Sequence, residues 1–131
     1  MITEDYVSFE TAKLLKEKGF DEGCSFVVDV ISKGVMPVSW PTTNSDIEDE
    51  KASLIALPTL QMAMKWLREV HNLCLEPYRT ACGYLCGVAR VPSGSEIYGQ
   101  DYEGDDEASG QFTTYEKSCE AAIKYCLENL I

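Results

Sequence analysis

The sequence predicts an α+β fold, with an antiparallel β-sheet of about five or six short strands and three amphipathic helices packed chiefly on one face. Two observations lead to this prediction. Three segments repeat apolar residues at the spacing of a helix face, and the segments between them are short, rich in β-branched and aromatic residues, and bounded by turn residues. The 131 residues, of which 45% are hydrophobic, suit one domain with a real core. We therefore expect a single α+β domain over residues 1–131.

The first helix is predicted from its two ends. Ser8 is expected to cap the N-terminus. Gly19 occupies the place of a left-handed residue after the C-terminus, and Phe20 can then fold back on Leu15. The apolar residues at helical spacing, which should form the buried side, are Phe9, Ala12 and Leu15.

A β-hairpin is expected next. Residues 24–31 are rich in β-branched and aromatic side chains, and the chain turns through residues 32–34 into a return strand over residues 35–40. Pro37 has no N–H group to donate, so the return strand should lie at a sheet edge. Residues 54–57 predict a further strand. One face of the first strand is expected to carry Phe26, Val28 and Val30.

Residues 59–72 form the clearest amphipathic helix of the chain. Asn72 is expected to end it, because asparagine tolerates a left-handed backbone. Met62 and Trp66 widen its apolar side. The residues of the apolar stripe are Leu60, Ala63, Met64, Leu67, Val70 and His71.

The second half repeats the pattern of strands followed by a helix. Residues 73–80 predict a strand interrupted by Pro77, and residues 83–91 are apolar on both faces, which favours a central strand. Residues 92–95 are turn residues, and residues 96–102 predict the partner strand. In the last helix, Thr113 and Glu116 have capping-box spacing. The residues that should line its buried side are Tyr115, Cys119, Ala122, Cys126 and Leu130.

The net charge of −11 comes mainly from two segments, because the other acidic and basic residues nearly balance. Such an acidic chain is not expected to bind nucleic acid directly. The two runs predict either solvated loops or an imitation of a nucleic-acid surface. The glycine in the second run does not have EF-hand spacing. The acidic residues are Asp46, Glu48, Asp49 and Glu50, then Asp101, Glu103, Asp105, Asp106 and Glu107.

The six cysteines are expected to be structural thiols in a reducing compartment. A zinc site built from Cys74, Cys82, Cys86 and His71 is a weaker alternative. If residues 82–91 are one strand, Cys82 and Cys86 stand about 13 Å apart, too far for a single tetrahedral zinc. A nucleophilic pair of Cys86 and His71 is a further alternative.

Catalytic motifs are missing from the sequence, which has no P-loop, no dinucleotide fingerprint and no nucleophile elbow. We therefore predict a non-enzymatic binding or accessory protein, without a cofactor, that contacts an unknown protein partner or a second copy of itself. The alternatives are an acidic mimic that inhibits a DNA-binding protein, and a thiol- or metal-dependent enzyme. The residues that are candidates for a protein contact are Trp40, Tyr98 and Tyr102 with Asp101, Glu103, Asp105, Asp106 and Glu107. For the three aromatic residues, packing within the sheet or the loops is the alternative.

The segments TLQMAMKWLREVHN, YEKSCEAAIKYCLENLI and YVSFETAKLLKEKGFDE resemble those of small uncharacterised proteins encoded in prophages and mobile elements of gut Bacteroidetes. This resemblance implies a phage or prophage origin and residence inside a bacterial host. It implies no activity and no site residue. No secretory signal and no apolar run long enough for a membrane span occur in the sequence, so we predict a cytoplasmic protein without membrane association.

Overall fold

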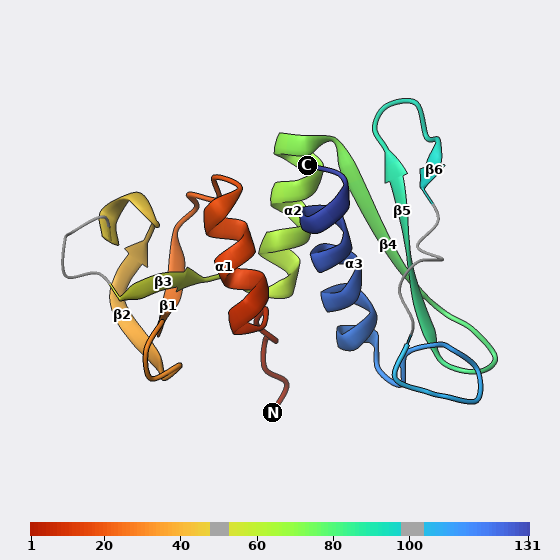
Figure 1. The fold of residues 1–131 in the computed structure, drawn as a ribbon, viewed down its shortest axis with the longest axis horizontal. Helices are drawn as coiled ribbons and strands as arrows, with labels where there is room; N and C mark the ends of the chain where they lie inside the picture. The colour runs from red at the N-terminus through yellow and green to blue at the C-terminus, as the bar shows by residue number, and fades with distance from the viewer. Residues whose placement is uncertain (48–52, 98–103) are drawn as a thin grey trace. The chain divides into compact units, whose positions relative to one another are not determined.

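A computed structural model describes residues 1–47, 53–97 and 104–131, and its α+β architecture confirms the predicted fold class (Figure 1). The strands pair antiparallel in two three-stranded sheets. The chain divides into two compact units, Met1–Thr59 and Leu60–Ile131, and each is described by itself. The prediction of a single domain stays a prediction.

The sheet of the first unit has the order β2-β1-β3, from β1 (Cys24–Asp29), β2 (Val35–Thr42) and β3 (Leu54–Leu57). Pro37 therefore lies on an edge strand, as predicted. The prediction that the first strand reaches residue 31 and carries Val30 on one face with Phe26 and Val28 is wrong. The strand ends at Asp29, whose carboxylate accepts the N–H groups of Ile31 (2.8 Å) and Ser32 (3.2 Å) and so starts the turn. Val30 is consequently 38% exposed.

Helix α1 (Phe9–Glu17) has the ends that the sequence predicts. The Thr11 N–H donates to Ser8 Oγ (3.2 Å) at the N-terminus. Gly19 has a φ of 93°, and the Phe20 N–H donates to the carbonyl of Leu15 (2.9 Å), which closes the C-terminus. The helix packs on β3. A short 3-10 helix, η1 (Ser45–Ile47), lies between β2 and β3 in the chain.

In the second unit, helix α2 (Leu60–His71) ends at Asn72, whose φ of 57° confirms the predicted left-handed stop. The expected apolar stripe is wrong at its end, because Val70 is 53% exposed and His71 is only half-buried. Trp66, which was expected to widen the stripe, is buried. The buried residues are Leu60, Ala63, Met64, Trp66 and Leu67.

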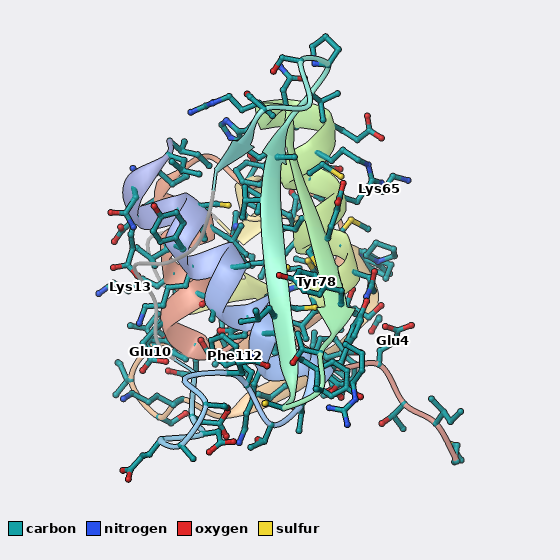
Figure 2. The ribbon with its side chains drawn as sticks, turned by 90° about the vertical axis from the view of Figure 1, so that its right-hand side faces the viewer. Glu4, Glu10, Lys13, Lys65, Tyr78 and Phe112 are labelled. Carbon is teal, nitrogen blue, oxygen red and sulfur yellow. The ribbon has the colours of Figure 1, made fainter. Side chains whose placement is uncertain are left out.

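The second sheet has the order β4-β5-β6, from β4 (Leu73–Arg79), β5 (Tyr84–Arg90) and β6 (Glu96–Ile97). The central position of β5 is confirmed. Helices α2 and α3 (Tyr115–Asn129) pack on one face of the sheet. Figure 2 looks onto the other face, which carries Tyr78 and is free of any helix of this unit.

Helix α3 begins one residue later than predicted, because Thr114 and not Thr113 is its cap. The Thr114 side chain accepts the N–H of Lys117 (3.1 Å). Its buried residues are Ser118, Cys119, Ala122, Ile123, Cys126 and Leu127. Across residues 1–47, 53–97 and 104–131, no helix combines the length and apolar character needed to cross a membrane.

Candidate protein-binding surfaces

The first unit displays an apolar surface on the hairpin formed by β1 and β2. We call it the hairpin surface. Trp40 is 74% exposed and Ile31 is 85% exposed, although both are large apolar residues that would gain free energy from burial. Isolated exposed apolar residues are common, and we take the exposed apolar residues of this one hairpin as a candidate contact site. The residues of the hairpin surface are Val30, Ile31, Val35, Met36 and Trp40.

A β-bulge presents Trp40 to solvent. Phe26 pairs with Pro37, whereas Cys24 pairs with Thr42, so residues 38–41 of β2 lie opposite Ser25 alone. The extra residues bend the strand outward, away from regular pairing. The Thr42 hydroxyl donates to the carbonyl of Trp40 (3.0 Å) and so steadies the far side of the bulge.

The base of this bulge is closely packed. A Cβ atom added at Gly23 would lie 2.9 Å from Cβ of Pro41, closer than such atoms can approach. The chain before β1 therefore packs directly against Pro41, and only a residue without a side chain fits at position 23. Since proline rings also fix the backbone on both sides, at Pro37 and Pro41, Trp40 projects from a rigid support.

The hairpin has few charged side chains, although the chain carries a net charge of −11. Residues 24–42 contain only two charged side chains, Asp29 and Lys33. Asp29 accepts hydrogen bonds in the turn, and Lys33 Nζ lies 5.4 Å from the centre of the Phe9 ring. The hairpin surface thus offers apolar contact with no large net charge to desolvate.

The strand edges of this sheet are poorly suited to the addition of another strand. Pro37 and the bulge interrupt the free edge of β2. At β3, the N–H of Ala56 donates to Asn44 Oδ1 (3.0 Å), and Asn44 Nδ2 donates to the carbonyl of Phe20 (2.8 Å). The buried Asn44 side chain therefore closes that edge. A partner would contact the side chains of the hairpin, not its backbone.

The second acidic run is the other predicted contact. Tyr98, Asp101, Tyr102 and Glu103 lie outside the described residues, as do Glu48, Asp49 and Glu50 of the first run. Asp105 is described, and it binds within its own unit. Its carboxylate accepts the Thr113 hydroxyl (2.6 Å), the Thr113 N–H (2.9 Å) and Lys117 Nζ (2.9 Å). The hydrogen bond from the Thr113 side chain and the Lys117 ammonium hold the pKa of Asp105 far below its ordinary value.

Asp106 also serves the structure of the loop. Its carboxylate accepts the Ala108 N–H (3.1 Å) and the Ser109 hydroxyl (3.0 Å), and its carbonyl accepts the Gly110 N–H (2.8 Å). Glu107 is exposed. Two of the three described carboxylates in this run therefore stabilise the loop, which leaves less negative charge available to a partner.

The residues of the considered zinc site do not converge. Cys82 is exposed in the β4–β5 turn, because β5 begins only at Tyr84. The antiparallel register places Cys74 opposite Ala89 and Cys86 opposite Pro77, so Cys74 and Cys86 lie on opposite faces of the sheet. Among the described residues, no group of three or more His, Cys, Asp or Glu side chains could hold a metal ion.

His71 packs against an aromatic ring. Its ring centre lies 4.6 Å from that of Trp66, with the two planes at 72°. Such an edge-to-face contact at the end of α2 indicates a structural position. Nε2 of His71 is buried and has no hydrogen-bond partner among the described residues.

The sequence did not predict that Cys86 and Cys119 meet. Both thiols are buried, as is Cys126, and none of the three is in a disulfide. The Cys119 side chain and burial raise the pKa of Cys86, whereas the Cys86 side chain lowers the pKa of Cys119. Burial raises the pKa of Cys126 to about 12. Only a prediction of how β5 faces α3 could have revealed this pair.

Comparison with protein-family models, curated proteins and solved structures finds no match to this chain.

Proposed function

We propose that this chain is a non-enzymatic binding protein that contacts a protein partner through the hairpin surface. The observation that carries the proposal is the exposed Trp40 indole on a rigid, proline-bounded bulge. Tryptophan residues dominate the free energy of many protein interfaces, because they bury a large area with few rotamers to fix. A phage or prophage origin and a place in the cytoplasm of a bacterial host belong to the same proposal.

The hairpin surface is favoured over the acidic loop as the contact site. An acidic mimic of nucleic acid needs free carboxylates in a regular array, whereas Asp105 is paired with Lys117 and Asp106 with its own loop. The exposed side chains of the hairpin surface are apolar instead, and an interface core is enriched in such residues. Imitation of nucleic acid therefore has less support.

The experiment compares two variants with the wild type. Immobilised wild type, Trp40→Ala and Val70→Ala are each exposed to bacterial host lysate, and the retained proteins are quantified. Val70 is the matched control, because it is an exposed apolar residue in the other unit. We expect Trp40→Ala to weaken retention about 30-fold or more, the effect of losing an interface hot spot, and Val70→Ala to retain the partner like the wild type.

Two results would contradict the proposal. One is a specific partner retained equally by all three proteins, and the other is an equal loss in both variants. Sedimentation of the purified chain at several concentrations shows whether the partner is a second copy. In that case Trp40→Ala, but not Val70→Ala, should shift the chain to monomer.

A further inference from the structure

The hairpin surface is bordered by acidic residues at the end that carries Trp40. On the chain that leads into β1, Glu22 is exposed and immediately precedes Gly23. Gly23 packs against Pro41, which is the residue after Trp40. The fold therefore brings the backbone that carries this carboxylate next to the bulge that presents the indole, although the two segments are far apart in the sequence.

Two more exposed carboxylates are fixed at the same end of the hairpin. The Asp46 carboxylate accepts the Thr43 N–H (3.0 Å) in the chain that follows β2. The Asp21 carboxylate accepts the N–H (2.7 Å) and the hydroxyl (2.6 Å) of Ser45, which ties the segment before β1 to the segment after β2. These hydrogen bonds hold the pKa of Asp21 below its ordinary value, so the group stays ionised. We call Asp21, Glu22 and Asp46 the acidic rim.

The charge of the acidic rim is not neutralised by a neighbouring cation. Among the described residues, none of its three carboxylates forms an ion pair, and the groups that donate to them are neutral. Lys33 is the only basic side chain within residues 19–47. It lies in the turn at the other end of the hairpin, 5.4 Å from the centre of the Phe9 ring. The border of the hairpin surface is therefore negative near Trp40 and positive near Ile31.

We propose that the partner of the hairpin surface is a protein with a basic face, which places lysine or arginine side chains against the acidic rim while an apolar patch covers Trp40. This inference rests on the proposed function and adds the chemistry of the partner. An apolar anchor supplies the centre of an interface, whereas complementary charges at its border select the partner and speed its approach. The net charge of −11 attracts such a partner from a distance.

A second copy of this chain fits the same surface less well. Each copy contributes the three carboxylates of the acidic rim but only one basic side chain, Lys33. Two copies that met through their hairpin surfaces would therefore gather an excess of negative charge at the border of the contact. Like charges brought together across an interface lower the affinity. A basic partner avoids this repulsion and gains a charge contact at each rim carboxylate that it reaches.

The test uses a probe of known composition, a displayed library of cyclic random peptides in which acidic and basic residues are equally frequent. The library is selected on the immobilised full chain, and peptides that bind the wild type but not Trp40→Ala are kept. This step discards peptides that the overall acidity of the chain attracts. We expect the kept peptides to combine apolar residues with lysine or arginine, and to contain aspartate and glutamate about two- to fivefold less often than the library, the effect of one exposed charge contact.

Single substitutions then locate the charge contact. A kept peptide with a fluorescent label is titrated with wild type, Glu22→Gln and Glu10→Gln, and fluorescence anisotropy gives the affinities. Glu10 is the matched control, because it is an exposed glutamate at the start of α1, next to the Phe9 ring that Lys33 approaches at the other end of the hairpin. We expect Glu22→Gln to weaken binding about two- to fivefold and Glu10→Gln to leave it unchanged. At about 1 M salt, which screens exposed charges, the difference should vanish.

The outcomes separate this inference from the proposed function. Trp40-dependent peptides without an excess of lysine and arginine would overturn the basic partner, and so would equal affinity of Glu22→Gln and the wild type, but both results would leave the hairpin surface as a contact site. A library that yields no Trp40-dependent peptide would overturn the proposed function and this inference with it. A dimer in sedimentation that Trp40→Ala abolishes would show that a second copy occupies the surface, which overturns the basic partner alone.

Discussion

Trp40 shows how a single residue can matter for binding and little for folding. Its indole is 74% exposed, so it makes few contacts within the first unit. Its neighbours Pro37 and Pro41 hold the backbone, and the Trp40 carbonyl, not the side chain, accepts the Thr42 hydroxyl. The side chain can therefore be removed without disturbing the bulge that carries it.

We expect Trp40→Ala to change the free energy of unfolding by no more than about 0.5 kcal/mol, as for other surface substitutions. Urea unfolding followed by circular dichroism measures this change. The substitution leaves the other tryptophan, Trp66 in the buried face of α2, in place. A loss of several kcal/mol would show that the indole supports the fold, and the role assigned to it here would be wrong.

Gly23 packs against Pro41, which lies in the bulge. We expect Gly23→Ala to cost about 1–3 kcal/mol, the range for overpacking, because the new Cβ would lie 2.9 Å from Pro41. Gly87→Ala is the matched control, since its Cβ would find its nearest neighbour at 3.8 Å, an ordinary contact. Thermal unfolding of both variants measures the difference. Equal stability of the two would contradict the packing described here.

Helix α2 separates a buried face from an exposed one within a single turn. Leu67 is fully buried, whereas Val70, three residues later, is 53% exposed. We expect Leu67→Ala to cost about 2–5 kcal/mol through lost burial and the cavity it leaves, and Val70→Ala to cost less than about 0.5 kcal/mol. Chemical denaturation of the two variants provides the comparison. A cost at Val70 as large as that at Leu67 would mean that the helix is turned differently.

The acidic loop and α3 are joined by Asp105, and this link should depend on pH. The pKa of Asp105 is depressed in the folded chain, so the unfolded chain binds the proton more readily. The link therefore contributes stability above the ordinary aspartate pKa of about 4 and loses it as pH falls below that value. We expect Asp105→Asn to weaken the fall in stability in this acidic range.

Glu107→Gln is the control for this prediction, because Glu107 is an exposed acid in the same loop. Urea midpoints measured from neutral to acidic pH give the three profiles. If Asp105→Asn followed the wild-type profile while Glu107→Gln flattened it, the hydrogen bonds of Asp105 would not govern the acid response of the loop.

At the scale of elements, the sequence predicts those helix ends and strand positions that depend on residues close together in the chain. Ser8, Gly19 and Asn72 mark helix ends because their side chains or backbone freedom act on adjacent residues. Pro37 marks an edge because it lacks a donor. Val30 and Val70 were misplaced because apolar periodicity does not show where a strand or a buried face ends. Thr113 was misassigned because Asp105, eight residues earlier, accepts its hydroxyl while Thr114 caps the helix.

At the scale of the molecule, the candidate sites depend on contacts between distant segments, which the sequence does not reveal. The sequence indicates Trp40 as a candidate contact residue, but the bulge that presents it follows from the pairing of β1 with β2. The hairpin surface lies within the unit Met1–Thr59, so it can be tested without altering residues of the other unit.

Hydroxyl-radical footprinting of the chain in its captured complex tests most directly whether a partner covers Trp40. Oxidation of each tryptophan is quantified by mass spectrometry with and without the partner, and buried Trp66 serves as the internal reference. We predict that the partner strongly protects Trp40 and leaves the low reactivity of Trp66 unchanged. Equal oxidation of Trp40 in the free and bound chain, with protection confined to the acidic loop, would contradict the account.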